Sequence, residues 1–360
     1  MDDIFFMKRA LRLAKRGGGK VSPNPMVGAL IVKNERIISE GYHAFFGGPH
    51  AEVDALRKLK AGEAIGSTLY VNLEPCSHYG KTPPCTDAII KAGIKRVVIG
   101  MVDPNPLVHG RGIDKLKKAG IEVRTGILEE QSIELNEPYI KYITKHRPFV
   151  TLKIAQTLDG RIATSRGFSR WITGEKSRRF VHKMRRESDA VLVGVNTVIA
   201  DDPQLTVRMV SGKGKRRVIL DSSLRIPLEA KVLHHSDPKN TVVVTTDQSP
   251  PDKVKILQKM GVTVWILKKT DGMVDLVSLW QKMADEGIAS VLVEGGRQIF
   301  TTMLRHGEVD RVIIFFAPKI FGEGINSIGD LGIDFPDEAI LFKKTRWYKK
   351  ENDMIFEGRL

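Results

Sequence analysis

The chain has 360 residues, with 57 Lys and Arg against 42 Asp and Glu, so its formal net charge is +15 with histidines neutral. At roughly 150 residues per domain, this length predicts two domains and excludes a small single-core module. A composition of 42% hydrophobic and 28% charged residues excludes a disordered or fibrous chain.

The apolar pattern and the cysteine count indicate where the protein works. No stretch approaches the roughly 20 apolar residues that cross a bilayer. The N-terminus begins acidic and lacks the small-residue cleavage site of a secretory signal. The two cysteines, Cys76 and Cys85, are too few for a disulfide scaffold. We therefore expect a cytoplasmic protein that binds no membrane.

The basic charge bears on partners rather than on the fold. Basic residues are spread along the chain, runs such as KGKRR at 213–217 are short, and aromatic residues make up only 7%. A generally basic surface, or a phosphorylated small substrate, accounts for this charge as well as nucleic acid does. We expect no nucleic-acid partner.

In the first half, predicted helices alternate with predicted strands. Apolar residues at helical spacing predict an amphipathic helix over 4–14, which the glycines at 17–19 end. Strands are predicted over 26–32, 68–73, 96–102 and 121–126, with helices beginning near Pro49, Pro84 and Gly112. A last helix over 128–145 ends before the HRP sequence, where we place the domain boundary. The alternation predicts an α/β architecture for a first domain over 1–146.

The second half repeats this alternation. Strands are predicted over 149–155, 190–195, 217–221, 241–246, 262–267, 290–296 and 310–316. Helical patterns such as 274–286 and 297–306 separate most of them. We expect a second α/β domain over 147–360 with a core of its own.

One histidine and two cysteines form a candidate metal site, with His50 followed by Cys76 and Cys85. A structural zinc site has four protein ligands, whereas a catalytic one leaves a position for water, whose pKa the metal lowers to about 7. Three ligands together with a nearby carboxylate, Glu52, therefore predict hydrolytic chemistry. Thiolate and imidazole ligands suit iron as well as zinc, and zinc is the metal that we expect.

Glu52 is the candidate catalytic group beside this site. Residues two apart on a helix do not face the same way, so Glu52 is better placed to serve a water molecule than to join His50 as a ligand. Both cysteines lie beside prolines near a predicted helix start, where amide groups favour thiolates. The H-x-E…P-C pattern is typical of zinc deaminases, whose glutamate moves protons between water and the leaving amine.

The segments around these residues resemble the deaminase domain of the bifunctional riboflavin-biosynthesis deaminase/reductases. They are SPNPMVGALIV (22–32), GGPHAE (47–52) and EPCSHYGKTPPC (74–85). Cytidine and transfer-RNA adenosine deaminases usually place their cysteines two residues apart, whereas the long insert here is characteristic of the riboflavin family.

The resemblance implies a cytidine-deaminase-like fold and a phosphorylated pyrimidine substrate. That substrate is a diaminopyrimidinone carrying a ribosylamino 5-phosphate, and hydrolysis at its ring amine releases ammonia. Asn24 would hydrogen-bond the substrate. His43, His78 and Lys81 would line the mouth of the site and help to bind the phosphate.

The second domain shows no G-x-G-x-x-G fingerprint after any predicted strand. Instead the strand VLVEGG runs into a helix at Arg297, and its paired glycines let backbone amides approach a pyrophosphate. Five segments resemble, in order, the reductase domain of the same family, a relative of dihydrofolate reductase: KIAQTLDGRIA (153–163), SRWITG (169–174), VGVNTVIADDPQLTVR (193–208), LDSSLRIP (220–227) and VEGG (293–296). This resemblance implies that NADPH reduces the ribosyl group to a ribityl chain after deamination.

The same resemblance assigns roles to residues of the second domain. NADPH would be held by Ala155, Trp171, Thr197, Asp201, Ser222 and the Gly296 loop. Substrate would be held by Ser169, Arg185, Leu205, Arg208 and Glu294, with the arginines suited to a phosphate because a guanidinium is always charged and binds in a bidentate manner. Lys153 and Glu294 would assist proton transfer at the ribose carbon, with Asp201 as a third candidate.

The sequence thus predicts an enzyme with two activities, and two other interpretations stay open. A nucleic-acid base deaminase with an appended binding domain would suit the charge, but the long insert and the reductase-like half argue against it. A zinc-stabilised nucleic-acid-binding protein would need a fourth protein ligand and no carboxylate such as Glu52. By resemblance we also expect a homo-oligomer, a dimer or larger.

Overall fold

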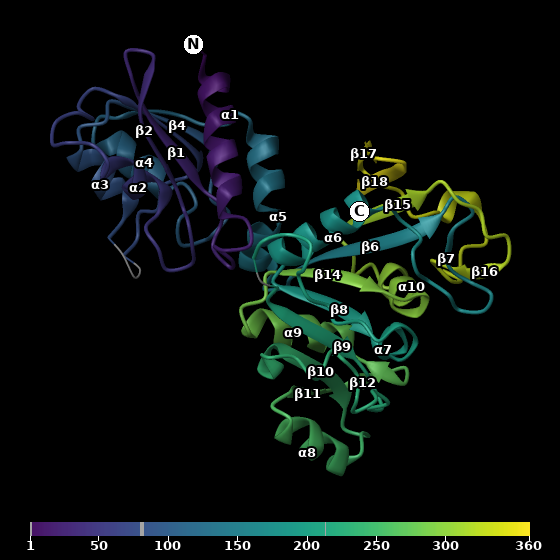
Figure 1. Cartoon of the computed structure of the whole chain (residues 1–360). Coiled ribbons are helices and arrows are strands. Elements are labelled where there is room, and N and C mark those ends of the chain that lie inside the picture. Colours follow the sequence, from purple (N-terminus) through teal and green to yellow (C-terminus); the bar gives the residue numbers. More distant parts are fainter. Residues whose placement is uncertain (1, 80–82, 213) are drawn as a thin grey trace. The chain divides into compact units, whose positions relative to one another are not determined.

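The computed structural model describes residues 2–79, 83–212 and 214–360. The chain divides into two units, Met1–Arg147 and Pro148–Leu360, and each has its own sheet (Figure 1). Among the described residues, no helix combines the length and apolar character needed to span a membrane.

The first unit is a five-stranded sheet in the order β2-β1-β3-β4-β5. β1 pairs antiparallel with β2 and β3, whereas β3, β4 and β5 run parallel. The strands are β1 (Gly28–Lys33), β2 (Arg36–Tyr42), β3 (Thr68–Leu73), β4 (Arg96–Met101) and β5 (Glu122–Arg124). The helices are α1 (Asp3–Ala14), α2 (Ala51–Leu56), α3 (Cys85–Lys91), α4 (Arg111–Lys118) and α5 (Glu129–Lys145), with a 3-10 turn at Lys15–Gly17.

Alternate residues of these strands point to opposite faces, and each face has its own core. Ile31, Val71 and Ile99 pack with residues of α2, α3 and α4 on one face. Leu30 and Tyr70 pack with α1 on the other. The sheet is therefore buried on both sides, which explains why its central strands read as continuous apolar runs.

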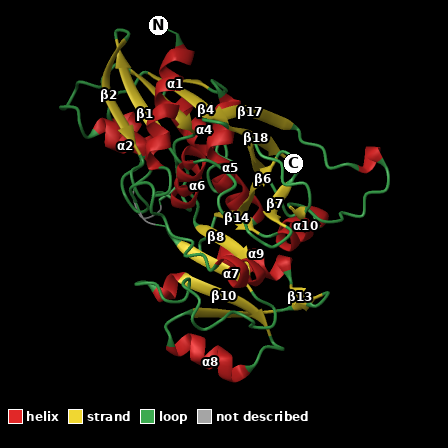
Figure 2. Ribbon diagram, turned by 45° about the vertical axis from the view of Figure 1, so that its right-hand side comes forward, coloured by secondary structure: helices red, strands yellow, loops and turns green. Residues whose placement is uncertain are grey.

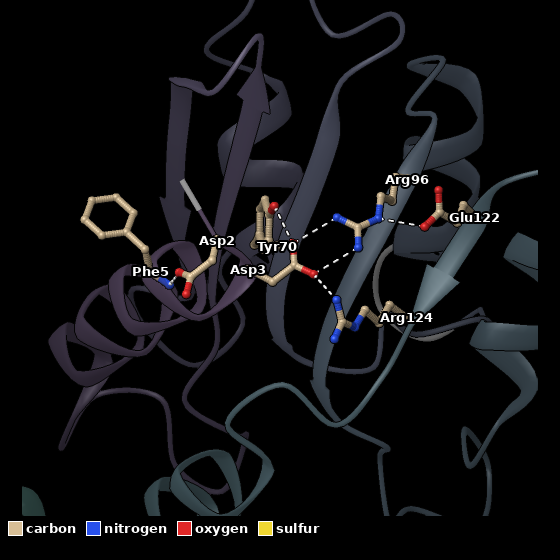
Figure 3. A network of polar contacts seen from close by, with 7 residues as sticks. All are labelled: Asp2, Asp3, Phe5, Tyr70, Arg96, Glu122 and Arg124. Atoms are coloured by element: carbon tan, nitrogen blue, oxygen red, sulfur yellow. Dashed lines mark hydrogen bonds and ion pairs between the residues drawn. The ribbon is translucent and has the colours of Figure 1, made fainter.

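A cluster of charged side chains joins α1 to the sheet (Figure 3). The carboxylate of Asp3 accepts two hydrogen bonds from Arg96 at 2.9 Å, one from Tyr70 at 2.9 Å and one from Arg124 at 2.8 Å. Arg96 also donates to Glu122 at 2.8 Å. The hydrogen bonds from Arg96 hold the pKa of Asp3 below its ordinary value, although burial acts in the opposite direction.

Asp3→Asn is expected to destabilise the first unit by about 1–2 kcal/mol at pH 7, because it removes charge-assisted hydrogen bonds. The pKa of Asp3 is lower in the folded chain, so the unfolded chain takes up its proton first as the pH falls below about 4. The difference between variant and wild type should therefore shrink toward zero in acid. Urea unfolding at a series of pH values measures it.

Glu122→Gln is the matched control, since it removes only the exposed outer partner of Arg96. We expect it to cost less than about 0.5 kcal/mol. A destabilisation by Asp3→Asn that stays constant from pH 7 to pH 3 would contradict the role assigned to the Asp3 charge.

The second unit is a nine-stranded sheet in the order β11-β10-β9-β8-β14-β6-β15-β18-β17. The strands from β11 to β15 are parallel, and β18 pairs antiparallel with β15 and β17. They are β6 (Phe149–Thr157), β8 (Ala190–Gly194), β9 (Arg216–Leu220), β10 (Thr241–Thr246), β11 (Thr263–Leu267), β14 (Ser290–Gly295), β15 (Arg311–Ala317), β17 (Lys344–Lys350) and β18 (Asp353–Arg359). Two small ladders pair β7 (Arg161–Thr164) with β16 (Gly324–Asn326) and β12 (Lys269–Thr270) with β13 (Met273–Val274).

Helices cover both faces of this sheet (Figure 2). α9 (Leu276–Asp285) and α10 (Arg297–Arg305) pack on one face. α6 (Glu175–Glu187), α7 (Val195–Asp201) and α8 (Pro251–Lys259) pack on the other. Since α7 and α10 begin where β8 and β14 end, loops gather at the carboxyl ends of the parallel strands, where ligands bind in open α/β sheets.

Several strands were not predicted from the sequence. β17, with the sequence KTRWYKK, is an edge strand whose side chains are mostly exposed, so it lacks an apolar run. β18 (DMIFEGR) and β2 (RIISEGY) have only short apolar runs and no strict alternation of polar and apolar residues. Pairing with a neighbouring strand, rather than local pattern, makes these segments strands.

Candidate active sites

Three potential metal ligands converge in the first unit. His50 immediately precedes α2, Cys76 follows β3, and Cys85 is the first residue of α3. The Nδ1 atom of His50 lies 3.3 Å from Sγ of Cys85 and 3.6 Å from Sγ of Cys76. All three ligand atoms lie within 4.8 Å of one another.

This donor set fits zinc. Two sulfurs and one imidazole nitrogen are the soft and borderline ligands that zinc prefers, and three of them leave one tetrahedral position free. The backbone N–H of Cys85, at the start of α3, donates to Sγ of Cys76 at 3.3 Å. The Cys85 thiol and His50 also donate to Cys76 and lower its pKa to about 4, which favours the thiolate that binds a metal.

Glu52 lies beside this cluster, in the first turn of α2. Its side chain is buried, with 3% of the residue exposed, and burial raises its pKa to about 7. The charge of Cys76 raises this pKa further, whereas His50 lowers it. The structure corrects one expectation: His50 has extended backbone angles and precedes the helix, so the two residues do not share a helix as the spacing argument assumed.

Asn24 and His43 form a hydrogen-bonded pair next to His50. Nδ1 of His43 lies 2.9 Å from the carbonyl of Pro49, which can only accept, so Nδ1 carries a proton. Nε2 of His43 then accepts from the amide nitrogen of Asn24 at 3.2 Å. Burial lowers the pKa of His43 and favours this neutral form. The His43 and His50 rings meet edge to face with centroids 5.6 Å apart.

The other two residues expected near the phosphate are placed differently. His78 is exposed in the loop between β3 and α3. Lys81 lies outside the described residues, so its expected role stays a prediction.

Glu74 is a positioning residue that was not predicted from the sequence. Its buried carboxylate accepts backbone hydrogen bonds from Asp103, Gly110, Gly112 and Ile113 at 2.9–3.2 Å. A Cβ at Gly112 would lie 2.1 Å from the carbonyl oxygen of Pro75, so the start of α4 packs directly on the segment that carries Cys76. A lone glutamate before Pro-Cys gives no local signal of these contacts, because its partners come 29 to 39 residues later.

The second unit contains a cavity of about 1640 Å³ at the carboxyl ends of its central strands. Every residue predicted for the reductase site lines it. They are Lys153, Ala155, Ser169, Trp171, Arg185, Thr197, Asp201, Leu205, Arg208, Ser222, Glu294 and Gly296.

One end of this cavity fits a dinucleotide phosphate. Gly296 has a φ of +90° and immediately precedes α10. A Cβ at Gly295 would lie 2.8 Å from Oγ1 of Thr197, so only a glycine lets this loop approach α7 so closely. The start of α10 lines the cavity, and the unpaired backbone N–H groups of a helix start suit a pyrophosphate.

A buried ionic cluster occupies another part of the cavity wall. Arg185 binds both carboxylate oxygens of Glu294, at 2.5 and 2.8 Å, and donates to the carbonyl of Thr206 at 3.0 Å. Nζ of Lys153 lies 3.9 Å from Glu294. Burial lowers the pKa of Lys153, and the charge of Arg185 lowers it further, whereas Glu294 raises it. Burial opposes ionisation of Glu294, but Arg185 and Lys153 outweigh it and lower its pKa.

Four more of the predicted residues, Ser169, Asp201, Ser222 and Trp171, have defined contacts. Ser169 donates to Asp201 at 2.7 Å, and Ser222 accepts from the backbone N–H of Val274 at 3.0 Å. Trp171 is 63% exposed, and the guanidinium of Arg178 lies 4.5 Å from its ring centroid. The indole is therefore available to a ligand. A tryptophan that served only core packing would be buried.

Comparisons with known proteins match both halves of the chain. A family model described as the RibD C-terminal domain matches residues 148–356. Another, described as the cytidine and deoxycytidylate deaminase zinc-binding region, matches residues 1–101. These matches confirm the expected α/β fold with an N-terminal cytidine-deaminase-like and a C-terminal dihydrofolate-reductase-like domain.

Relatives match over nearly the whole length. The riboflavin biosynthesis protein RibD of Aquifex aeolicus is 50% identical over 98% of this chain and 97% of that protein. RibD of Actinobacillus pleuropneumoniae is 44% identical over 95% of this chain and 91% of that protein.

Two solved structures agree with this. A diaminohydroxyphosphoribosylaminopyrimidine deaminase/5-amino-6-(5-phosphoribosylamino)uracil reductase from Thermotoga maritima has 42% identity and a TM-score of 0.85 over 99% of this chain and 98% of that one. Acinetobacter baumannii RibD has 38% identity and a TM-score of 0.88 over the same shares. The chain therefore belongs to the RibD family of bifunctional riboflavin-biosynthesis enzymes, which join a zinc-binding deaminase domain to a reductase domain of the NADPH-using type.

Proposed function

We propose that this enzyme deaminates 2,5-diamino-6-ribosylamino-4(3H)-pyrimidinone 5′-phosphate and then reduces the ribosyl side chain, giving 5-amino-6-ribitylamino-uracil 5′-phosphate. The observation that carries this proposal is the pairing of two different sites in one chain. One is the His50, Cys76 and Cys85 cluster with buried Glu52 beside it. The other is the cavity that Lys153 and Glu294 line.

In the deaminase site, His50, Cys76 and Cys85 would hold the zinc ion. When bound, zinc supplies a Lewis acid that lowers the pKa of water to about 7. Glu52 takes a proton from the attacking water and passes it to the ring amine, which leaves as ammonia. The amide nitrogen of Asn24 donates to His43. This contact orients Oδ1 of Asn24 as an acceptor for a substrate N–H. His78 and Lys81 would help to bind the phosphate. His43, expected to do the same, is buried and has both ring nitrogens engaged by Pro49 and Asn24, so its role is to orient Asn24.

In the reductase site, Ala155, Trp171, Thr197, Asp201, Ser222 and the Gly296 loop would hold NADPH. When bound, NADPH supplies a hydride for the ribose carbon. Lys153 holds a proton at Nζ and delivers it to the ribose oxygen as the ring opens. Glu294 positions Lys153 and binds substrate.

Substrate in this cavity also meets Ser169, Leu205, Arg185 and Arg208. Arg185 uses Nε, Nη1 and Nη2 to bind Glu294 and Thr206. Arg208 is therefore the arginine with more capacity left for a phosphate.

The first test follows both reactions in one cuvette. Purified, zinc-loaded protein receives the diaminopyrimidinone ribosyl phosphate and NADPH, and ammonia release and NADPH oxidation are recorded together. We expect matched amounts of both. Ammonia release without NADPH oxidation would contradict the reductase half of the proposal. If neither ammonia release nor NADPH oxidation is seen, and the protein then deaminates a polynucleotide, the result would favour a nucleic-acid base deaminase.

Cys85→Ser is expected to lower the zinc content from about one ion per chain to a small fraction, because a hydroxyl is a poor ligand for zinc. Ammonia release should fall with it, while reduction of pre-deaminated substrate continues. Metal analysis after gel filtration measures the occupancy. Ser77→Ala, in the same loop, is the control and should keep its zinc; full occupancy in Cys85→Ser would refute the ligand role.

We also propose that the enzyme works in the cytoplasm as a homo-oligomer, a dimer or larger. The two cysteines, both placed at the candidate metal site, support a reducing compartment. Light scattering of the purified protein measures the oligomeric state.

A further inference from the structure

α6 presents one row of polar side chains to the reductase cavity. Arg178, His182 and Arg185 follow at helical spacing, so they share a face, and all three line the cavity. Arg178 lies over the ring of Trp171, and Arg185 binds Glu294. His182, between them, has no role in the reaction described above.

The imidazole of His182 holds the backbone of Arg208. His182 is 7% exposed, and its Nδ1 lies 3.1 Å from the backbone nitrogen of Arg208. A backbone N–H can only donate, so Nδ1 carries no proton and the ring is the acceptor. Two residues earlier, the carbonyl of Thr206 accepts from Arg185. One helix therefore fixes the segment 206–208 at two points.

The surroundings keep His182 in the neutral form that this contact needs. Burial and the positive charges of Arg185 and Arg208 lower the pKa of His182 to about 4, against an opposing effect of Glu294 and of the Thr206 backbone. The acceptor at Nδ1 is therefore present throughout the neutral pH range.

Arg208 needs such an anchor because its loop has no regular secondary structure. Its Nη1 donates to Gln204 at 2.6 Å and to Oγ1 of Thr206 at 2.8 Å, which orients the guanidinium from within the same loop. Leu205 has a φ of +53°, a conformation that costs energy for a side chain of this kind. A strained loop holds its shape only where outside contacts fix it.

We propose that His182 is a positioning residue which, through Nδ1, sets the backbone of Arg208 and so directs that arginine at the phosphate of the reductase substrate. This inference rests on the proposed function, in which Arg208 binds the substrate phosphate. It predicts that loss of the Nδ1 acceptor weakens recognition of the phosphate and leaves the chemical step alone.

The test compares two amides that place an acceptor at different points. The amide of His182→Asn reaches the position of Nδ1, whereas that of His182→Gln reaches toward Nε2. Steady-state reduction of pre-deaminated substrate is measured with saturating NADPH, with the 5′-phosphate present and with it removed. We expect His182→Gln and His182→Leu to raise the KM for the phosphorylated substrate about tenfold, the effect of one lost hydrogen bond. The kcat and the KM for NADPH should stay within about twofold, and His182→Asn should stay close to wild type.

Two further measurements separate positioning from general damage. On the substrate without phosphate, all variants should match wild type. The double variant His182→Leu with Arg208→Ala should be no worse than Arg208→Ala alone, since the two residues act through one contact.

Any one of four results would overturn the inference. They are an equal rise in KM on both substrates, a fall in kcat, additive effects in the double variant, and an unchanged KM in His182→Gln. If His182→Leu does not fold, the comparison of His182→Asn with His182→Gln still tests the inference. Absence of any reduction by the wild-type enzyme would instead count against the proposed function.

Discussion

Glu52→Gln is expected to abolish ammonia release while zinc stays bound and pre-deaminated substrate is still reduced. Glutamine keeps the shape of the side chain but cannot take a proton from water. Positioned proton transfer contributes about 10²–10⁴-fold to a rate, so the loss should lie in that range or above. Since Glu52 lies beside the His50, Cys76 and Cys85 cluster and is not one of its three ligands, zinc content should not change. Ammonia assays, metal analysis and NADPH oxidation measure the three outcomes.

Glu63→Gln is the matched control, because Glu63 is an exposed glutamate of the same unit. It should release ammonia at the wild-type rate. If Glu52→Gln lost zinc as Cys85→Ser should, Glu52 would be a ligand and not a proton carrier. Loss of reduction together with deamination would contradict the independence of the two sites.

Much of the deaminase site could be predicted because its residues carry chemistry that is visible in short segments. His50, Glu52, Cys76 and Cys85 lie in two motifs whose spacing already indicates a metal and a proton carrier. The backbone around them was harder to predict. His50 precedes α2 instead of lying on it, since the extended backbone before a helix start turns its ring toward the cysteines.

In the reductase site, the sequence predicted which residues belong to the site but not the contacts between them. The resemblance placed twelve residues in one site, and all of them line one cavity. It could not show that Arg185 is bound to Glu294, because the two are 109 residues apart and meet only when α6 packs on the sheet. Nor could it single out His182, a histidine on a helix whose partner is a backbone amide rather than another motif.

The edge of the second sheet was missed for a related reason. β17 has no apolar face of its own, and its pairing with β18 makes it a strand. Trp347 of β17 stacks with Phe316 of β15, with ring centroids 5.8 Å apart, so the strand is anchored through its neighbours. A local pattern contains no information about such contacts.

Lys153→Met is expected to reduce the rate of NADPH oxidation by about 10²–10⁴-fold while ammonia release stays at the wild-type level. Methionine keeps much of the length of the side chain and removes the ammonium group. The bidentate contact between Arg185 and Glu294 does not involve Lys153, so the cavity wall should persist. Single-turnover reduction with saturating NADPH measures the chemical step.

The pH dependence gives a second readout for the same residue. A lysine that donates a proton must be charged, and burial and Arg185 lower the pKa of Lys153 from 10.5. The wild-type reduction rate should therefore fall as the pH rises through this lowered pKa, earlier than for an exposed lysine. In Lys153→Met this fall should disappear, whereas Lys176→Met, which changes an exposed lysine on α6, should keep it. An alkaline fall that persists in Lys153→Met would assign the proton to another group, and an unchanged reduction rate would remove Lys153 from the mechanism.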